Sequence, residues 1–228
     1  RMSARDLPQT PSWLGQGLFL AEVTAVQDPE HRSRVEVRVH AFDGVAGQDA
    51  PIWARVATAF AGQDYGAFFI PNVGDEVLVG FVQGDGRQPV VVGSLWNGAA
   101  PAPETLPGDE VRRWTLVGRQ GTRIALVEED QPTIRLSTPG GAVAEITDAG
   151  GGKMQIYAGG ARIVIDPNGV TISTPAKVKI DASQIEMSAG MVTVNAGLSK
   201  FSGVVQCDTL ISNAVISASY TPGAGNIW

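Results

Sequence analysis

The sequence predicts an all-β protein with two parts, a small closed barrel followed by a long shaft that three identical chains build together. Two patterns predict this fold. Five segments of alternating polar and apolar residues fill the first hundred positions without a helical stretch, and apolar pairs then recur at a nearly constant spacing. The 28 glycines and 14 prolines among 228 residues fit many short strands joined by tight turns.

The N-terminal part begins with residues 1–16, which are polar and which we expect to form a flexible or partner-bound arm. Residues 17–98 contain the five alternating segments. The expected strands span residues 18–23, 35–39, 52–57, 74–81 and 88–95. Gly84-Asp85-Gly86 lies between the last two and is a strong hairpin signal. Five strands in about 80 residues predict a closed barrel of the OB type.

A Pro-rich segment, residues 99–120, is the expected linker to a second part at residues 121–217, and residues 218–228 form the expected tip. The second part is most regular at residues 162–194. Apolar pairs begin there at positions 163, 170, 178, 185 and 192, so the steps are 7, 8, 7 and 7. Such a period leaves room for one short strand and one tight turn. The ten side chains expected to form a core are Ile163, Ile165, Val170, Ile172, Val178, Ile180, Ile185, Met187, Val192 and Val194.

These short strands predict a homotrimer, because two inward side chains per strand cannot form a core alone. A single-chain solenoid uses about 20 or more residues per repeat, so seven or eight residues supply only one side of it. Three copies around one axis supply the missing sides and leave no exposed sheet edge. The result is an intertwined triple-stranded β-helix, with residues such as Lys179, Glu186 and Thr193 facing water. Periodicity alone leaves an open meander sheet or a β-sandwich as the alternative.

Composition argues against several classes of protein. The formal net charge of −6 disfavours a nucleic-acid partner, and the cluster of Arg32, Arg34 and Arg38 has no aromatic residue beside it in the sequence. The single cysteine, Cys207, excludes an intrachain disulfide. No stretch approaches the roughly 20 apolar residues of a membrane helix, and we expect no secretory leader.

No catalytic or metal-binding constellation stands out either. The run Glu128-Glu129-Asp130 is the densest group of carboxylates, but no aromatic substrate platform accompanies it, and a solvated loop is the favoured interpretation. The two histidines, His31 and His40, do not have the spacing of a metal pair. We therefore expect no enzyme activity, no catalytic residue, no bound metal and no cofactor.

One group of residues carries a resemblance to known proteins. Its members are Trp53, Gly66, Pro71, Gly74, Asp75, Glu76, Val77, Gly84, Asp85, Pro89, Gly93 and Asn97. In this order and spacing they resemble the OB-domain signature of contractile-tail spikes, the family of phage baseplate assembly protein V and of VgrG. The family's second half is a triple-stranded β-helix, which resembles the repeat above.

The signature is expected to be scaffold. Pro71 and Gly74 would shape a turn, and Asp75-Glu76 would hold it through bonds from side chain to backbone. Gly66 and Gly93 would permit close backbone approach.

The resemblance implies a central spike, the membrane-piercing needle of a contractile phage tail or injection system, with the barrels as a collar and Trp228 at the pointed end. It implies a separate tail-tube hub protein at the N-terminal end and a PAAR-type tip protein at the C-terminal end. The expected tip-docking residues are Tyr220, Pro222, Ile227 and Trp228. With no histidine in the needle, an iron-bound tip is not expected.

The same resemblance implies a place in an assembled baseplate, after synthesis in the cytoplasm without a signal peptide, and transient contact with the envelope of a target cell. Two other classes stay open. One is an OB-fold protein that binds a ligand or nucleic acid, and the other is a cell-wall hydrolase with an unrecognised site. The sequence does not distinguish a phage from a type VI-like or an extracellular injection system.

Overall fold

The computed structural model describes residues 17–44 and 50–219. Within them the chain is all-β, with fourteen strands, two short 3₁₀ turns (His40–Phe42 and Val82–Gly84) and no α-helix. None of the described residues belongs to an apolar helix of membrane-spanning length. The expected arm and the four expected tip-docking residues lie outside the described residues. The chain divides into a first unit, Arg1–Ala176, and a second unit, Lys177–Trp228.

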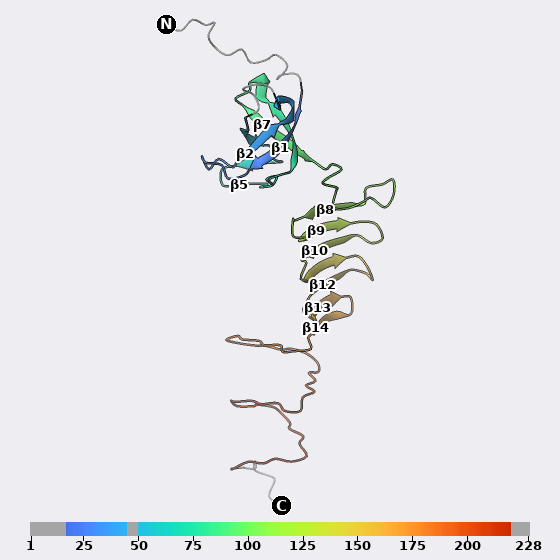
Figure 1. The fold of residues 1–228 in the computed structure, drawn as a ribbon. Helices are drawn as coiled ribbons and strands as arrows, with labels where there is room; N and C mark the ends of the chain where they lie inside the picture. The colour runs from blue at the N-terminus through green and yellow to red at the C-terminus, as the bar shows by residue number, and fades with distance from the viewer. Residues whose placement is uncertain (1–16, 45–49, 220–228) are drawn as a thin grey trace, which may run out of the picture. The chain divides into compact units, whose positions relative to one another are not determined.

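The first unit opens with a closed five-stranded barrel in the order β1-β2-β3-β7-β6, which confirms the predicted barrel (Figure 1). Its strands are β1 (Phe19–Ala25), β2 (Val35–Val39), β3 (Ile52–Val56), β6 (Glu76–Phe81) and β7 (Pro89–Leu95). All pairs are antiparallel except β3 with β7. Every second side chain points inward, so Val23 of β1, Val35 and Val37 of β2, Val77 and Val79 of β6 and Val91 of β7 form a fully buried core.

The barrel holds one hairpin that the sequence did not predict. It consists of β4 (Ala61–Gly62) and β5 (Tyr65–Gly66), two antiparallel strands between β3 and β6. Two-residue strands are too short to show the alternation by which strands are recognised in a sequence.

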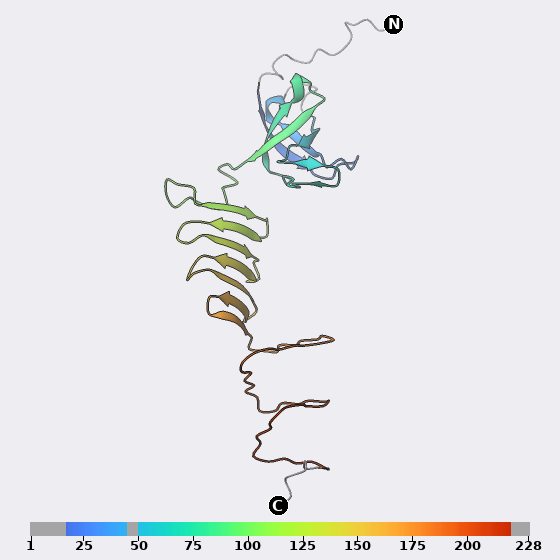
Figure 2. The same cartoon turned by 180° about the vertical axis from the view of Figure 1, so that it is seen from behind.

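A seven-stranded antiparallel meander follows the barrel, with its strands in chain order (Figure 2). The strands are β8 (Arg113–Val117), β9 (Arg123–Val127), β10 (Thr133–Ser137), β11 (Val143–Thr147), β12 (Lys153–Ala158), β13 (Ala161–Asp166) and β14 (Gly169–Ser173). Strand β8 lies inside residues 99–120, which the sequence predicted as linker, so the sheet begins before the expected start at residue 121. The predicted linker extended too far toward the C-terminus. The alternation of Trp114 and Leu116, which marks β8, directly follows a Pro-rich stretch and was included in it.

The second unit contains no strand among residues 177–219, although the sequence predicts strands at Val178, Ile185 and Val192. The chain instead runs in repeated narrow lateral loops (Figure 1). It bends at Ser183, Gly190 and Gly197, seven residues apart. A strand requires a neighbour for its backbone N–H and C=O groups, and the loops of one chain do not pair with one another.

Candidate functional site

The meander sheet has one entirely apolar face that nothing in the described chain covers. Because the strands pair antiparallel in register, alternate side chains stack into two columns across all seven strands. One column contains Trp114, Leu126, Ile134, Ile146, Met154, Ile165 and Val170, and the other contains Leu116, Ile124, Leu136, Ala144, Ile156, Ile163 and Ile172. We call these fourteen residues the apolar face.

Exposure separates this face from an ordinary surface. Apart from Ala144, its side chains are 40% to 67% exposed, from Ile163 to Val170. Contiguous apolar surfaces on this scale mark places where another molecule binds. The sequence placed four of these residues in a core, on β13 and β14. It did not include the ten on β8 to β12 in that core, although the spacing of Ile134 and Leu136 is the same signal.

Over β10 to β13, the opposite face of the sheet carries hydrogen-bonded and charged side chains. Arg135 pairs with Glu145 at 3.2 Å, Gln155 donates to Glu145 at 2.6 Å, and Arg162 donates to Gln155 at 2.6 Å. These contacts form a ladder across β10 to β13, where each charge meets a partner on a neighbouring strand. The sheet therefore has one side suited to water and one side that requires a cover.

Of the acidic run Glu128-Glu129-Asp130, Glu129 binds an arginine of the sheet. The Arg113 guanidinium donates to both carboxylate oxygens of Glu129, at 2.7 and 2.9 Å, and to Glu104 of the preceding segment at 3.2 Å. Arg123 also binds Glu104. Burial opposes the ionisation of Glu104, but hydrogen bonds and the two arginine charges outweigh it, so the pKa of Glu104 lies below its usual value.

The predicted core residues of the second unit are also exposed, and in a regular way. Val178, Ile185 and Val192 are 55%, 57% and 57% exposed, and the second members of the same pairs are 69%, 74% and 70% exposed. Two apolar side chains with similar exposures thus recur every seven residues. The second members are Ile180, Met187 and Val194.

The barrel signature residues lie mainly in turns and at strand ends. Gly74 has a φ of +89°, which favours glycine, and its N–H donates to the Val23 carbonyl at 2.9 Å. The Asp75 carboxylate accepts the Asn72 N–H at 2.8 Å, which closes the turn before β6. Glu76 was expected to bind backbone in the same turn. Its carboxylate instead accepts a hydrogen bond from the Asn97 side-chain amide, which joins the start of β6 to the segment after β7.

The remaining signature residues have comparable structural roles. Asp85 accepts hydrogen bonds from the Arg87 N–H and guanidinium in the turn between β6 and β7, next to Gly84 with a φ of +73°. Val77 and Pro89 point into the barrel core. Trp53 lies on β3, with the Arg34 guanidinium carbon 5.9 Å from its ring centroid. Pro71 precedes the turn at Gly74.

The two glycines expected to allow close approach differ. A Cβ at Gly66 would lie 2.9 Å from the Phe60 carbonyl oxygen, and its φ is +154°, so this glycine is required by its own chain. A Cβ at Gly93 would meet no atom within 4 Å. The expectation for Gly93 is therefore wrong within this chain.

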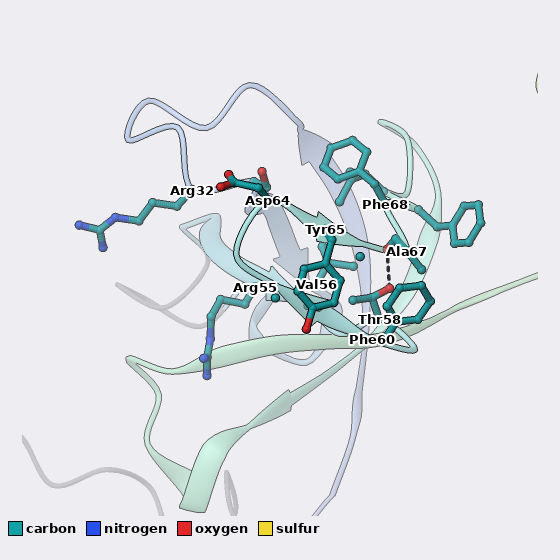
Figure 3. Close-up of a pocket in the computed structure, with 15 residues that line it drawn as sticks. Arg32, Arg55, Val56, Thr58, Phe60, Asp64, Tyr65, Ala67 and Phe68 are labelled. Carbon is teal, nitrogen blue, oxygen red and sulfur yellow. Dashed lines mark hydrogen bonds between the residues drawn. The ribbon is translucent and has the colours of Figure 1, made fainter.

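The barrel also carries a cavity beside the β4–β5 hairpin (Figure 3). Arg32 and Arg55 line it together with aromatic residues of the hairpin and the segment that follows. The Thr58 hydroxyl donates to the Ala67 carbonyl and ties the two ends of this segment together. Four side chains in this segment are strongly exposed: Phe60, Tyr65, Phe68 and Phe69. The sequence analysis assigned no role to these four residues as a group, although four aromatics in ten positions are a visible signal.

The Asp28 carboxylate, in the turn between β1 and β2, stabilises the barrel through hydrogen bonds. The Arg34 guanidinium donates to both Asp28 oxygens at 2.8 and 2.9 Å, and the N–H groups of Glu30 and Arg32 donate to them at 3.0 Å. These contacts, chiefly that of Arg34, hold the pKa of Asp28 well below its usual range. Among the described residues no three His, Cys, Asp or Glu side chains gather into a set that could hold a metal ion.

Two family models match this chain. Residues 19–96 match the model of the type VI secretion system/phage-baseplate injector OB domain. Residues 133–198 match the phage baseplate V C-terminal trimerisation domain, which spans β10 to β14 and the regular loops of the second unit.

Three relatives are type VI secretion system spike proteins. VgrG4b of Pseudomonas aeruginosa is 42% identical over 80 residues, which are 35% of this chain and 10% of the relative. VgrG1c of the same organism is 32% identical over 117 residues, 49% of this chain and 16% of the relative. VgrG3 of Vibrio cholerae is 37% identical over 67 residues, 29% of this chain and 7% of the relative.

This chain thus matches less than a fifth of the length of each of these relatives. The two family models, in contrast, together cover more than half of this chain, one over the barrel and the other over β10 to β14 and the start of the second unit. The chain belongs to the contractile-tail spike family, which includes phage baseplate assembly protein V and the VgrG spikes.

Proposed function

We propose that three copies of this chain form the central spike of a contractile injection machine. The observation that carries the proposal is the apolar face, which extends over all seven strands of the meander and has no cover in a single chain. Three such sheets turned face to face about one axis enclose it completely. The match to a trimerisation domain supports the number three.

The energy available from this closure is large. Fully burying a Val, Leu or Ile side chain contributes roughly 1.5–3 kcal/mol. The side chains of the apolar face are about half exposed, so each contributes about 1 kcal/mol when the trimer covers the remainder. With thirteen such side chains per chain, assembly is favoured strongly over an exposed monomeric sheet.

The second unit also presents apolar side chains that a single chain leaves uncovered, but it has no strands. Each of its seven-residue repeats, or heptads, presents two apolar side chains and has no strand partner within the described chain. In the trimer the heptads of three chains pair with one another, which satisfies their backbone groups and buries Val178 and its equivalents. This part is the intertwined triple-stranded β-helix of the needle.

The proposed action is mechanical. Contraction of a sheath drives the tube forward, and the rigid trimer concentrates the force on a narrow end that pierces the target envelope. The charged ladder on the outer face of the meander keeps the shaft soluble, and no step of this action requires a catalytic group. The barrels join the needle to a separate hub protein, and the C-terminal residues bind a PAAR-type tip protein within the assembled baseplate.

Native mass spectrometry of the full chain tests the proposal. We expect a mass three times the 23.9 kDa of one chain. Ile163→Asp, on the apolar face, should abolish the trimer. Thr171→Asp is the matched control, because it adds the same charge to the opposite face of the adjacent strand. A wild-type monomer at micromolar concentration, or equal masses for the two variants, would refute the trimeric spike. Clearing of a peptidoglycan gel by the purified protein would overturn the non-enzymatic role.

A further inference from the structure

The cavity beside the β4–β5 hairpin has no role in the needle (Figure 3). Its volume is about 670 Å³, which falls within the range of roughly 300–1,000 Å³ that is typical of ligand sites. Its walls are the β1–β2 loop, strand β3 and residues 58–70, which we call the aromatic loop. In OB barrels the loop between the first two strands and the face of strands 2 and 3 bind extended polymers. The cavity therefore lies where barrels of this type hold a ligand.

Tyr65 offers a flat and fixed surface at this cavity. It lies opposite Gly62 in the β4–β5 hairpin, and a Cβ built at Gly62 would overlap its ring. The ring thus lies against the backbone of the hairpin, while Tyr65 as a whole is 68% exposed. An aromatic ring with one supported and one open face is suited to stacking. Phe60, Phe68 and Phe69 are also strongly exposed and extend the apolar surface around it.

Two free charges of opposite sign accompany the rings. Arg55 of β3 and Asp64 of the hairpin both line the cavity and are exposed. Neither side chain makes an ion pair or a hydrogen bond with any residue that the structure describes. Arg32 lines the cavity too, but its guanidinium lies 3.2 Å from the Glu30 carboxylate. The cavity thus offers one free donor group and one free acceptor group beside a stacking surface.

This combination fits a sugar polymer. A pyranose ring has an apolar face of C–H groups that stacks on an aromatic ring, and its hydroxyls both donate and accept hydrogen bonds. They can accept from the Arg55 guanidinium and donate to the Asp64 carboxylate, so that both charges gain partners. A nucleic-acid strand would instead bring phosphates toward Asp64, and the nearby Arg32 and Arg34 are already paired with carboxylates.

The surroundings of the cavity suit a ligand longer than one sugar. A second hollow of about 590 Å³ shares Ser33, Phe68 and Ile70 with the first, so the two adjoin. The β1–β2 loop that borders both is fixed by Asp28, whose carboxylate accepts hydrogen bonds from Arg34. A wall that is already ordered loses little conformational entropy when a ligand binds.

We propose that the barrel binds a neutral oligosaccharide in this cavity, with one sugar ring stacked on Tyr65 and its hydroxyls bonded to Arg55 and Asp64. The other residues of the aromatic loop and the adjoining hollow hold the neighbouring sugar units. The site requires the barrel of a single chain, so it is independent of the trimeric spike proposed above.

Isothermal titration calorimetry of the full-length protein tests this site. The probes are the tetramer of N-acetylglucosamine, maltotetraose and an oligothymidylate of eight nucleotides. We expect at least one tetrasaccharide to bind with a dissociation constant below about 1 mM. Tyr65→Ala should raise this constant at least tenfold, because it removes the stacking surface. Arg55→Ala and Asp64→Asn should each raise it at least threefold, and asparagine tolerates the φ of +62° at position 64.

Trp96→Ala is the matched control, because Trp96 is a 71% exposed aromatic residue next to β7 that does not line the cavity. If Tyr65→Ala lowers the melting temperature of the barrel, the Arg55 and Asp64 variants decide, since neither side chain has a bonded partner to lose. Absence of binding by both tetrasaccharides at about 1 mM would overturn the proposal. So would site variants that bind like Trp96→Ala, or an oligothymidylate that binds more tightly than both sugars.

Discussion

The clearest test of the needle is Ile180→Asp in the second unit, where the single chain has no strand. Ile180 is 69% exposed, so its full burial in the trimer contributes about 1–2 kcal/mol per chain, or about 3–6 kcal/mol for three chains. Replacing it removes this contribution and places three carboxylates near one axis, where each loses several kcal/mol of hydration. The apolar loss alone corresponds to a rise of about 10²–10⁴ in the trimer dissociation constant.

The assay is analytical ultracentrifugation over a concentration series, together with a thermal melt. Thr193→Asp is the matched control, because Thr193 lies between Val192 and Val194 and is expected to face water. We expect the control to assemble like the wild type and Ile180→Asp to dissociate. If Ile180→Asp keeps the trimer mass and melting temperature of the control, Ile180 faces outward and the proposed register of the heptads is wrong.

Two further predictions concern the barrel. Gly66→Ala should lower its melting temperature, because the added Cβ would lie 2.9 Å from the Phe60 carbonyl, whereas Gly93→Ala should leave it within a degree or two; equal effects in calorimetry would contradict the different surroundings of the two glycines. The depressed pKa of Asp28 means that its contribution to stability is complete above the unfolded value of about 4 and is lost as the pH falls further, through the folded value. Asp28→Asn should therefore lower stability at pH 7 and flatten its decline between pH 4 and 2, and an unchanged acid profile in urea melts would show that the Arg34 contact has no effect on stability.

The barrel could be predicted from the sequence because its information is local to one chain. Val35-Glu36-Val37-Arg38-Val39 alternates strictly, and every valine in it is buried. The β4–β5 hairpin could not be predicted in this way, since two residues per strand contain no period. The role of Gly93 could not be assigned correctly either, because no atom of its own chain lies near its missing side chain.

In the C-terminal part of the chain, by contrast, the same sequence pattern leads to two different structures. Ile163 and Val178 belong to the same sequence repeat, but Ile163 lies on β13 and Val178 on a segment without a strand. The pattern specifies which side chains must be covered, whereas a strand also requires a neighbour at hydrogen-bonding distance. Turns such as Gly159-Gly160, between β12 and β13, return the chain on itself and provide that neighbour up to β14. Beyond residue 176 no other segment of the same chain pairs with the backbone. The hydrogen-bonding partner of these residues is therefore expected to be another copy of the chain.

The spacing of the bends sets the width of such a needle. Bends fall at Ser183, Gly190 and Gly197, and then at Gly203, Asp208, Asn213 and Ala218, so the step shortens from seven residues to five. At about 3.3 Å per extended residue, seven residues span about 23 Å and five span about 16 Å. If each copy forms one side of the shaft between bends, the side shortens by nearly a third toward residue 218. The same change in spacing that ends the regular repeat would therefore narrow the needle toward its C-terminal end, where a piercing device needs the smallest cross-section.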